Sequence, residues 1–395
     1  MSYHLTYLEA VVTGLVQGVT ELFPISSLGH NVLLPALIGG SWANALNVSA
    51  PGSPYLAFIV GLHVATAVAM IAYFWRDWLR IVRGFVSSLR WRSITTPDQR
   101  LAWMIILGTI PVGIVGVALQ KVFTNVFAKP DLAAVFLAVN GVILLLSERM
   151  RRTRDAARGA ATVAVPQVPP RGPVPGRPAG RPGPEGYAQQ PWQQQQQGPD
   201  PRYGQQGNGQ QGNGQPGDGR DQYGRQQPEY YGRPPGRHAA GRPPGEHAVP
   251  AGAAAAVTDP AVAADQRLST MSYRQAVIVG GAQILALLPG ISRDGMVTVA
   301  GMWRGLRRED AVRFSFLLSA PVILAAGVLK AHELTGPMTK GMHGPVLVGS
   351  LIAGVSAFLS VRFLTKYFSE DKSLSPFGIY CLVAGLGSLA YLVIK

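Results

Sequence analysis

Six long apolar stretches are the feature that most constrains how this chain can fold. Each approaches the roughly 20 apolar residues that a helix needs to cross the hydrocarbon core of a bilayer. Only 14% of the 395 residues are charged, so six buried core helices of a soluble protein are the weaker explanation. We therefore predict an all-α integral membrane protein with six transmembrane helices. The stretches cover residues 55–75, 101–119, 131–147, 312–330, 346–363 and 377–394.

The basic residues are placed as in a membrane protein rather than as in a nucleic-acid-binding protein. The formal net charge is +14, and arginines cluster in one predicted loop between residues 76 and 100 and again between residues 149 and 154. Because positive residues favour the cytoplasmic side, both segments are predicted to be cytoplasmic, with the 120–130 loop and the C-terminus outside. We expect no nucleic-acid partner and no removable signal peptide. The single cysteine, Cys381, excludes an internal disulfide.

The middle of the chain has a different composition, rich in Pro, Gly, Gln and Arg. Its apolar content cannot offset the roughly 1–2 kcal/mol per residue that ordering a backbone costs. We predict a first membrane half at 1–150, a disordered cytoplasmic linker at 151–268 and a second membrane half at 269–395. A passive insertion is favoured over the alternative, a linker that recruits partners or anionic lipid.

The two membrane halves carry a weak internal repeat, GLVQGVTELFPISSLG and GGAQILALLPGISRDG. In each half a short apolar helix runs into a Pro/Ser/Gly turn, and three predicted spans follow. An odd number of spans inverts the second half relative to the first. We therefore predict two re-entrant helical hairpins that meet near the midplane and line a wet cavity. At a constant offset of 266, the repeat pairs Gly14 with Gly280, Gln17 with Gln283, Ser26 with Ser292, Ser27 with Arg293, and Gly29 with Gly295.

The first turn combines groups that could perform chemistry on a phosphate. Glu21 lies in an apolar helix, where a carboxylate is costly without a function. After it, Ser26, Ser27, Gly29 and His30 form a turn that opens onto a second helix, and helix N-termini favour anions. Serines at such a turn often serve only as helix caps. Together, however, Glu21, Ser27 and His30 supply a nucleophile, a proton carrier and an orienting group.

The second turn adds a positive charge. Gly290, Ser292 and Arg293 stand at another helix start, and arginine matches phosphate oxygens bidentately. An arginine within the membrane is costly without an anionic partner, so a snorkelling interfacial residue is the weaker explanation. A further basic cluster comprises Arg304, Arg307, Arg308 and Arg313. We interpret it as the positive charge expected on the cytoplasmic side, and the alternative is that one member binds phosphate.

These segments match known motifs. The first half has an (E/Q)xxxE pattern from Gln17 to Glu21 and a P-[IV]-S-S-x-G-H pattern from Pro24 to His30. The second half has PGISRDGMV where the motif is PGxSRSxxT, followed by FSFLLSAP at 314–321. In the motifs of both halves, the chain resembles the undecaprenyl pyrophosphate phosphatase family of the bacitracin-resistance type. The resemblance covers roughly 1–150 and 270–395.

The resemblance implies hydrolysis of undecaprenyl pyrophosphate to the monophosphate carrier used in peptidoglycan synthesis, and with it bacitracin resistance. The implied location is the bacterial plasma membrane, with the active site open to the extracytoplasmic side. Ser27 would attack the terminal phosphorus, His30 would handle its proton, and Arg293 would stabilise the phosphoryl oxygens. Attack by a metal-bound water is the open alternative. Predicted phosphate contacts are Ser26, Gly29, Gly290, Ser292, Gln17 and Thr298.

Three positions depart from the family pattern. Gln17 is an allowed variant but cannot act as a base, which moves that role to Glu21. Asp294 stands where the family usually has Ser, and Val297 where it has Thr, with Thr298 one position later. Glu21 would orient His30 or hold a divalent cation, Mg²⁺ or Ca²⁺, and Asp294 is a second candidate metal ligand. We expect no organic cofactor.

Two other functions compete. A type 2 phosphatidic acid phosphatase would need a histidine six residues beyond the arginine, where this chain has Val299. A polyprenyl-phosphate transporter or flippase is the stronger rival, because inverted repeats with paired hairpins are a transporter architecture. Ser27 and His30 beside Arg293 favour the phosphatase, since a carrier has less need of a nucleophile. The expected partners are the polyprenyl pyrophosphate lipid and the bilayer, and the sequence is compatible with a homodimer.

Overall fold

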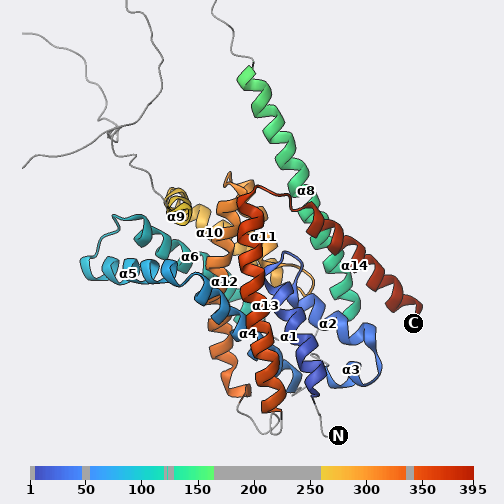
Figure 1. Ribbon diagram of the computed structural model, residues 1–395. Helices are drawn as coiled ribbons and strands as arrows, with labels where there is room; N and C mark the ends of the chain where they lie inside the picture. The colour runs from blue at the N-terminus through green and yellow to red at the C-terminus, as the bar shows by residue number, and fades with distance from the viewer. Residues whose placement is uncertain (1–4, 47–53, 120–121, 123–128, 164–258, 335–341) are drawn as a thin grey trace, which may run out of the picture. The chain divides into compact units, whose positions relative to one another are not determined.

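The computed structural model describes residues 5–46, 54–119, 122, 129–163, 259–334 and 342–395, and these residues form helices and no strand. Five of the helices are long and apolar enough to cross a bilayer, or six if the bent pair formed by α4 and α5 is one span. The prediction of an all-α membrane protein is therefore confirmed (Figure 1). The long helices are α4 (Pro54–Tyr73), α6 (Pro97–Ala118), α8 (Pro130–Val163), α12 (Arg308–Leu334), α13 (His343–Ser369) and α14 (Ser375–Ile394).

Short helices stand before the long helices of each half. In the first half they are α1 (Tyr7–Leu22), α2 (Ser27–Ile38) and α3 (Gly40–Ala45). In the second half they are α10 (Tyr273–Gly281), the 3₁₀ helix η2 (Ala282–Leu287) and α11 (Arg293–Trp303). The sequence sets their starts, because a capping box fixes the N-terminus of α1 at Thr6 and of α10 at Ser272.

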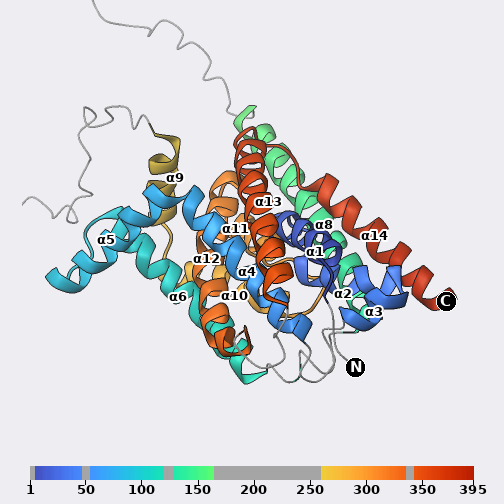
Figure 2. The ribbon, with the colours of Figure 1, turned by 60° about the horizontal axis from the view of Figure 1, so that its bottom comes forward.

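The two halves pack crosswise. Helix α1 lies along α13 of the other half, and α10 lies along α6 (Figures 1 and 2). Glycines allow both contacts: a Cβ added to Gly14 would clash with the Gly349 carbonyl, and one added to Gly280 would clash with Gly108. Gly14 and Gly280 are partners in the repeat, so two repeat-related glycines each allow a short helix to approach a helix of the other half closely. The re-entrant path of the short helices stays a prediction.

Helix α5 (Trp75–Trp91) occupies a segment that we expected to be a basic loop. That expectation was wrong because apolar residues recur there at helical spacing among the arginines. The helix turns away from α4 by 86°. Along it runs an exposed apolar stripe, Trp75, Leu79, Val82, Val86 and Leu89.

The edges of the predicted linker are helical. Helix α8 continues to Val163, and α9 (Pro260–Ser269) begins at an Asp259 cap with Pro in its first turn. Asp265 of α9 is buried and pairs with Arg80 of α5 at 2.7 Å and with Arg313 of α12 at 2.8 Å. These ion pairs explain why this edge of the segment is ordered. Residues 164–258, most of the predicted linker, lie outside the described residues.

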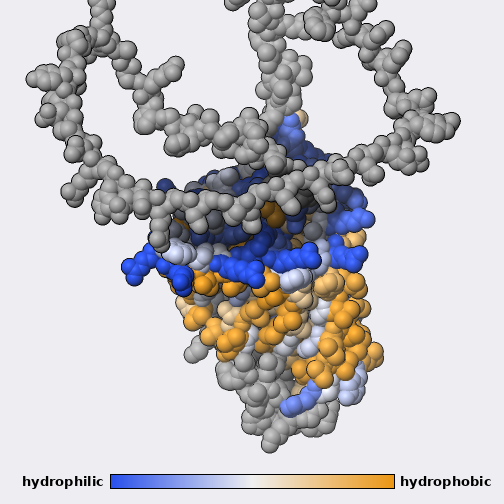
Figure 3. Space-filling model, turned by 60° about the vertical axis from the view of Figure 1, so that its left-hand side comes forward, coloured by the Kyte–Doolittle hydropathy of each residue, from blue (hydrophilic) through white to orange (hydrophobic). Residues whose placement is uncertain are grey.

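Polar and apolar residues separate along the described surface. Figure 3 shows hydrophilic residues gathered at one end and apolar residues covering the adjacent surface. In a bilayer, an apolar belt of this kind faces lipid while the charged end meets water. The surface is therefore that of a membrane protein, and the chain spans the membrane several times.

Candidate active site

A cavity of about 150 Å³ lies between the two halves of the chain. Its polar lining comes from the first turn, from α4 and from the second turn. His63 of α4, Val112 of α6 and Val322 of α12 stand well inside their helices, so the cavity lies within the membrane-spanning part. The lining residues are Glu21, Ser26, Ser27, Leu28, His63, Val112, Gln283, Ala286, Leu287, Ile291, Ser292, Arg293 and Val322.

Glu21 is the centre of the polar network. One carboxylate oxygen accepts a hydrogen bond from the Ser27 hydroxyl at 2.5 Å and lies 3.3 Å from His63 Nε2. The other oxygen meets the Arg293 guanidinium at 2.5 Å. The side chain of Glu21 is 4% exposed, so this carboxylate is shielded from solvent and compensated by a charge from the other half. The structure thus brings together three residues that the sequence predicted: Glu21, Ser27 and Arg293.

Two amides hold Glu21 in place. Gln17, one helical turn earlier, donates to the same carboxylate oxygen that Ser27 contacts, at 2.8 Å. Its own carbonyl oxygen accepts from Asn31 of α2 at 2.5 Å. Both Gln17 and Asn31 are fully buried and neither lines the cavity. Gln17 therefore lies behind the carboxylate, rather than at the predicted phosphate-contacting position, and fixes its orientation.

The two turns touch each other directly. The Ser26 hydroxyl accepts from the backbone N–H of Gly29 at 3.2 Å and from that of Gly290 at 3.1 Å. A Cβ on Gly29 would stand 2.7 Å from the Gly290 Cα, so glycine is required for this approach. Ser26 itself has a φ of 71°, a costly conformation for a non-glycine residue that the surrounding contacts must maintain.

Repeat-related serines cap both helices in the same way. The Ser292 hydroxyl accepts from the Gly295 N–H at 3.1 Å, just as Ser26 accepts from Gly29. The N-termini of α2 and α11 both reach the cavity, through Ser27 and Arg293. Helix N-termini carry free N–H groups and partial positive charge, so the cavity is suited to an anion.

The remaining predicted residues lie outside the cavity lining. His30 Nδ1 is 2.7 Å from the Ser26 carbonyl, and its Nε2 is 2.8 Å from the Tyr380 hydroxyl. Asp294 is buried and accepts from the hydroxyls of Ser315 at 2.6 Å and Ser319 at 2.5 Å. Gly29, Gly290 and Thr298 do not line the cavity either, and Thr298 is buried in α11.

Sequence reasoning missed His63 and Asn140 and used Gln283 only as the repeat partner of Gln17. His63 Nδ1 lies 2.8 Å from the Ile59 carbonyl oxygen, and its Nε2 faces Glu21. An ionisable residue in an apolar span was the available signal. Gln283 is the repeat partner of Gln17 and lines the cavity. Asn140 of α8 joins the two turns, since it donates to Pro24 at 2.9 Å and accepts from the Ser292 N–H at 3.0 Å.

A divalent cation is compatible with this donor set. Among the described residues, no cluster of three or more His, Cys, Asp or Glu side chains could hold a metal ion by itself. Mg²⁺, however, is commonly bound by one or two carboxylates together with substrate phosphates and water. Glu21 is the carboxylate in the cavity that fits this role, whereas Asp294 points to the serines of α12.

Fold and cavity together define a class: a multi-pass helical membrane protein whose two crosswise halves share an intramembrane site suited to a phosphate. Comparison with known proteins narrows the class. The sequence model of the family described as bacitracin resistance protein BacA matches residues 10–167 and 248–387. The chain belongs to this family. Residues between 167 and 248 fall outside the match, within the predicted linker.

Individual relatives agree with this assignment over their full lengths. The chain is 46% identical to an undecaprenyl-diphosphatase of Mycolicibacterium paratuberculosis, over 100% of both chains. It is 44% identical to undecaprenyl-diphosphatase 2 of Frankia alni, over 97% of both chains. It is 30% identical to undecaprenyl-diphosphatase 2 of Burkholderia orbicola, over 97% of this chain and 96% of the relative.

Proposed function

We propose that this chain is an undecaprenyl-diphosphatase, a membrane hydrolase that converts undecaprenyl diphosphate to undecaprenyl phosphate and inorganic phosphate. The reaction recycles a lipid carrier for peptidoglycan synthesis and confers resistance to bacitracin. The relatives named above support the substrate. Both turns that line the cavity come from one chain, which supports a site that is complete within a single copy.

The observation that carries the proposal is the hydrogen bond from Ser27 to Glu21, with Arg293 on the opposite carboxylate oxygen. In the first step the Ser27 oxygen attacks the terminal phosphorus, and its proton passes to Glu21. The bond from that phosphorus to the bridging oxygen breaks, and undecaprenyl phosphate leaves. This geometry favours Glu21 over His30 as the first proton acceptor, because Glu21 is the group in contact with the nucleophile.

Arg293 has two tasks in this mechanism. In the free protein it compensates Glu21, and its buried Nε has no hydrogen-bond partner among the described residues. A bound phosphoryl group would supply that partner and accept a bidentate contact. Together with the free N–H groups at the starts of α2 and α11, Arg293 then stabilises the charge that develops on the phosphoryl oxygens.

In the second step water attacks the phosphoserine. The bond between phosphorus and the Ser27 oxygen breaks, inorganic phosphate leaves, and a proton returns to Ser27. His63 faces Glu21 at 3.3 Å and is placed to exchange a proton with it between the two steps. A divalent cation held by Glu21 and the substrate would neutralise charge on the diphosphate.

We infer that the cavity opens to the extracytoplasmic side. By the positive-inside rule the basic end of the chain is cytoplasmic, and α6 begins at that end with Pro97. Val112 lies in the later part of α6, farther from the basic end, and it lines the cavity. The cavity is therefore nearer to the outer leaflet along this helix.

Phosphate release in detergent tests the proposed activity against the transporter alternative, which none of the relatives named above supports. Purified protein with Mg²⁺ and undecaprenyl diphosphate should release inorganic phosphate in micelles, where transport across a membrane is impossible. A protein that is folded, supplied with Mg²⁺ or Ca²⁺ and still inactive would refute the phosphatase assignment.

A further inference from the structure

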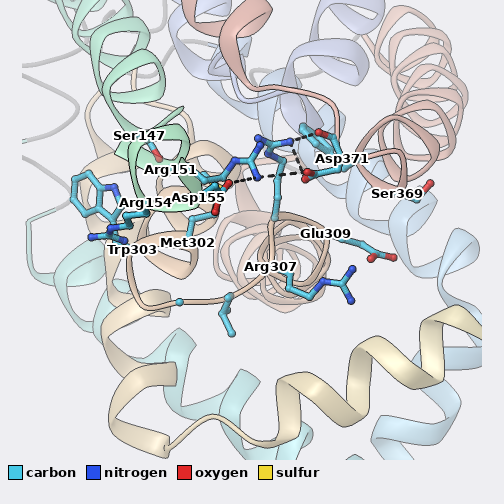
Figure 4. Close-up of a pocket in the computed structure, with 14 residues that line it drawn as sticks. Ser147, Arg151, Arg154, Asp155, Met302, Trp303, Arg307, Glu309, Ser369 and Asp371 are labelled. Atoms are coloured by element: carbon cyan, nitrogen blue, oxygen red, sulfur yellow. Dashed lines mark hydrogen bonds and ion pairs between the residues drawn. The ribbon is translucent and has the colours of Figure 1, made fainter. Parts of the chain in front are cut away.

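A second cavity lies at the polar end of the chain, far along the helices from the catalytic turns. It has a volume of about 320 Å³ and shares no lining residue with the active-site cavity. Its walls come from the end of α8, the turn between α11 and α12, and the turn after α13 (Figure 4). Nothing in the proposed reaction uses these residues.

Two of the arginines in this cavity are neutralised by carboxylates. Arg308 is fully buried and donates to both Glu148 oxygens at 2.9 Å and to the Asp371 carboxylate at 3.0 Å. Arg151 pairs with Asp155 at 3.0 Å and with Asp371 at 3.4 Å. In Figure 4 dashed lines join Arg151 to Asp155 and to Asp371.

Two further arginines leave the cavity with an excess of positive charge. Arg154 and Arg307 line it, and in the described part of the chain neither makes an ion pair with a carboxylate. Glu309, the remaining acidic residue of the lining, lies 3.7 Å from Arg267 of α9. Both side chains are exposed at the rim, where Figure 4 shows them on opposite sides, so they make the cavity electropositive rather than meet at one point.

The cavity wall also contains buried polar atoms without partners. The Ser147 hydroxyl, the Arg151 Nε and the Arg308 Nε find no hydrogen-bond partner among the described residues. Ser147 is 1% exposed, so bulk water does not compensate its hydroxyl. All three atoms can donate a hydrogen bond, and a buried donor without an acceptor is costly. An acceptor with several oxygens would satisfy them.

The other walls are apolar. Met302 and Phe368 are buried, while Trp303 is 49% exposed at the edge of the cavity. A half-exposed indole beside basic residues is typical of the membrane interface, where headgroups meet acyl chains. The cavity thus combines arginines suited to a phosphate with an apolar rim.

We propose that this cavity binds a phosphate-bearing anion at the cytoplasmic surface, as a site separate from the active site. The ligand chemistry is a phosphate ester or phosphate ion that accepts from the buried donors of Ser147, Arg151 and Arg308, with the positive charge of Arg154 and Arg307 at the rim favouring its binding. An anionic phospholipid headgroup or free phosphate can supply this group. The site goes beyond the proposed hydrolysis and does not depend on it.

Retention of lipid by the purified full-length protein tests the proposal. Protein in nanodiscs of phosphatidylcholine with phosphatidylglycerol is extracted gently, and bound lipid is counted by native mass spectrometry. The test variant is Arg154→Gln with Arg307→Gln. The matched control is Arg149→Gln with Arg304→Gln, which removes the same charge from residues of the same two segments that are likewise exposed but lie outside the cavity.

We expect phosphatidylglycerol binding to weaken about tenfold in the test variant, which corresponds to a loss of roughly 1.4 kcal/mol of binding free energy, and to stay unchanged in the control.

Displacement of the bound lipid by millimolar inorganic phosphate would identify free phosphate as the ligand, and resistance to displacement would identify the lipid headgroup. Equal loss in both variants would show bulk surface charge only, and no loss in either would also overturn the proposal. Melting temperature and phosphate release from undecaprenyl diphosphate should match wild type in both variants, which separates this result from a failure of the active site.

Discussion

At the scale of single residues, Glu21 organises the site. It contacts the nucleophile candidate, the arginine of the other half and a histidine through one buried carboxylate. Gln17 supports it from behind. Two adjacent short motifs were enough to predict Glu21 and Ser27, whereas His63 is separated from them in sequence and joins them only because α4 packs against α1.

Replacing Glu21 with Gln should remove the proton acceptor while keeping the side-chain shape. We expect kcat to fall by about 10²–10⁴, the range that a general base contributes. Glu9→Gln is the matched control, since Glu9 is also buried in α1 but caps that helix outside the cavity. A Glu21→Gln protein that keeps more than a tenth of wild-type kcat would contradict this role.

Asp294→Asn separates a structural from a catalytic role. Its carboxylate accepts two serine hydroxyls of α12 and does not line the cavity. An amide still accepts both bonds through its oxygen, so we expect kcat, measured with Mg²⁺, within about threefold of wild type and a destabilisation of roughly 1 kcal/mol. A large loss of kcat, with an unchanged melting temperature, would instead favour Asp294 as a metal ligand.

At the scale of helices, glycines determine which elements can cross. The repeat predicted that Gly14 and Gly280 are related, but not that each would meet a glycine of the opposite half. That information lies in how α13 and α6 pack, and one sequence does not display it. The sequence was likewise insufficient to predict the role of Ser26 and Ser292. Their position predicted anion binding, whereas their hydroxyls cap helices and, for Ser26, also join the two turns.

Gly280→Val should destabilise the crosswise packing, because its side chain would enter the backbone of Gly108. We expect a loss of about 1–3 kcal/mol, the usual cost of overpacking, read as a lower melting temperature in detergent. Gly113→Val, at a position in α6 with open space around it, should leave the melting temperature nearly unchanged. Equal effects of the two substitutions would argue against the close contact.

Helix α5 should lie in the membrane interface rather than cross the bilayer. Its 86° turn from α4 and its exposed apolar stripe beside arginines are the properties of an interfacial amphipathic helix. In protein whose buried Cys381 is replaced by Ala, Val86→Cys should resist a water-soluble maleimide in liposomes, and Arg83→Cys should react quickly. Equal reactivity at the two positions would place α5 in water.

At the scale of the whole molecule, one polar cavity is shared by two halves that the linker separates in sequence. The apolar stretches predicted the membrane class because a bilayer demands long apolar helices. The boundaries of the linker were less accurate, because buried ion pairs such as Asp265 with Arg80 order its edge although its composition is polar.

Deleting residues 168–247 should leave the activity nearly intact. The family model matches the residues on both sides of this segment but not the segment itself, and no residue of the active-site cavity lies within it. We expect kcat within about twofold of wild type in detergent, compared at equal amounts of folded protein. A loss of activity without a loss of expression would show that the segment contributes to catalysis.

The most direct test of the account is a rapid-quench experiment with undecaprenyl diphosphate labelled on its terminal phosphate. The contact between Ser27 and Glu21 predicts label bound covalently at residue 27 in the wild-type protein. Ser27→Ala should carry no label and should lose nearly all phosphate release, while its fold and melting temperature are retained. Substantial turnover by Ser27→Ala would contradict the account and would favour direct attack by water.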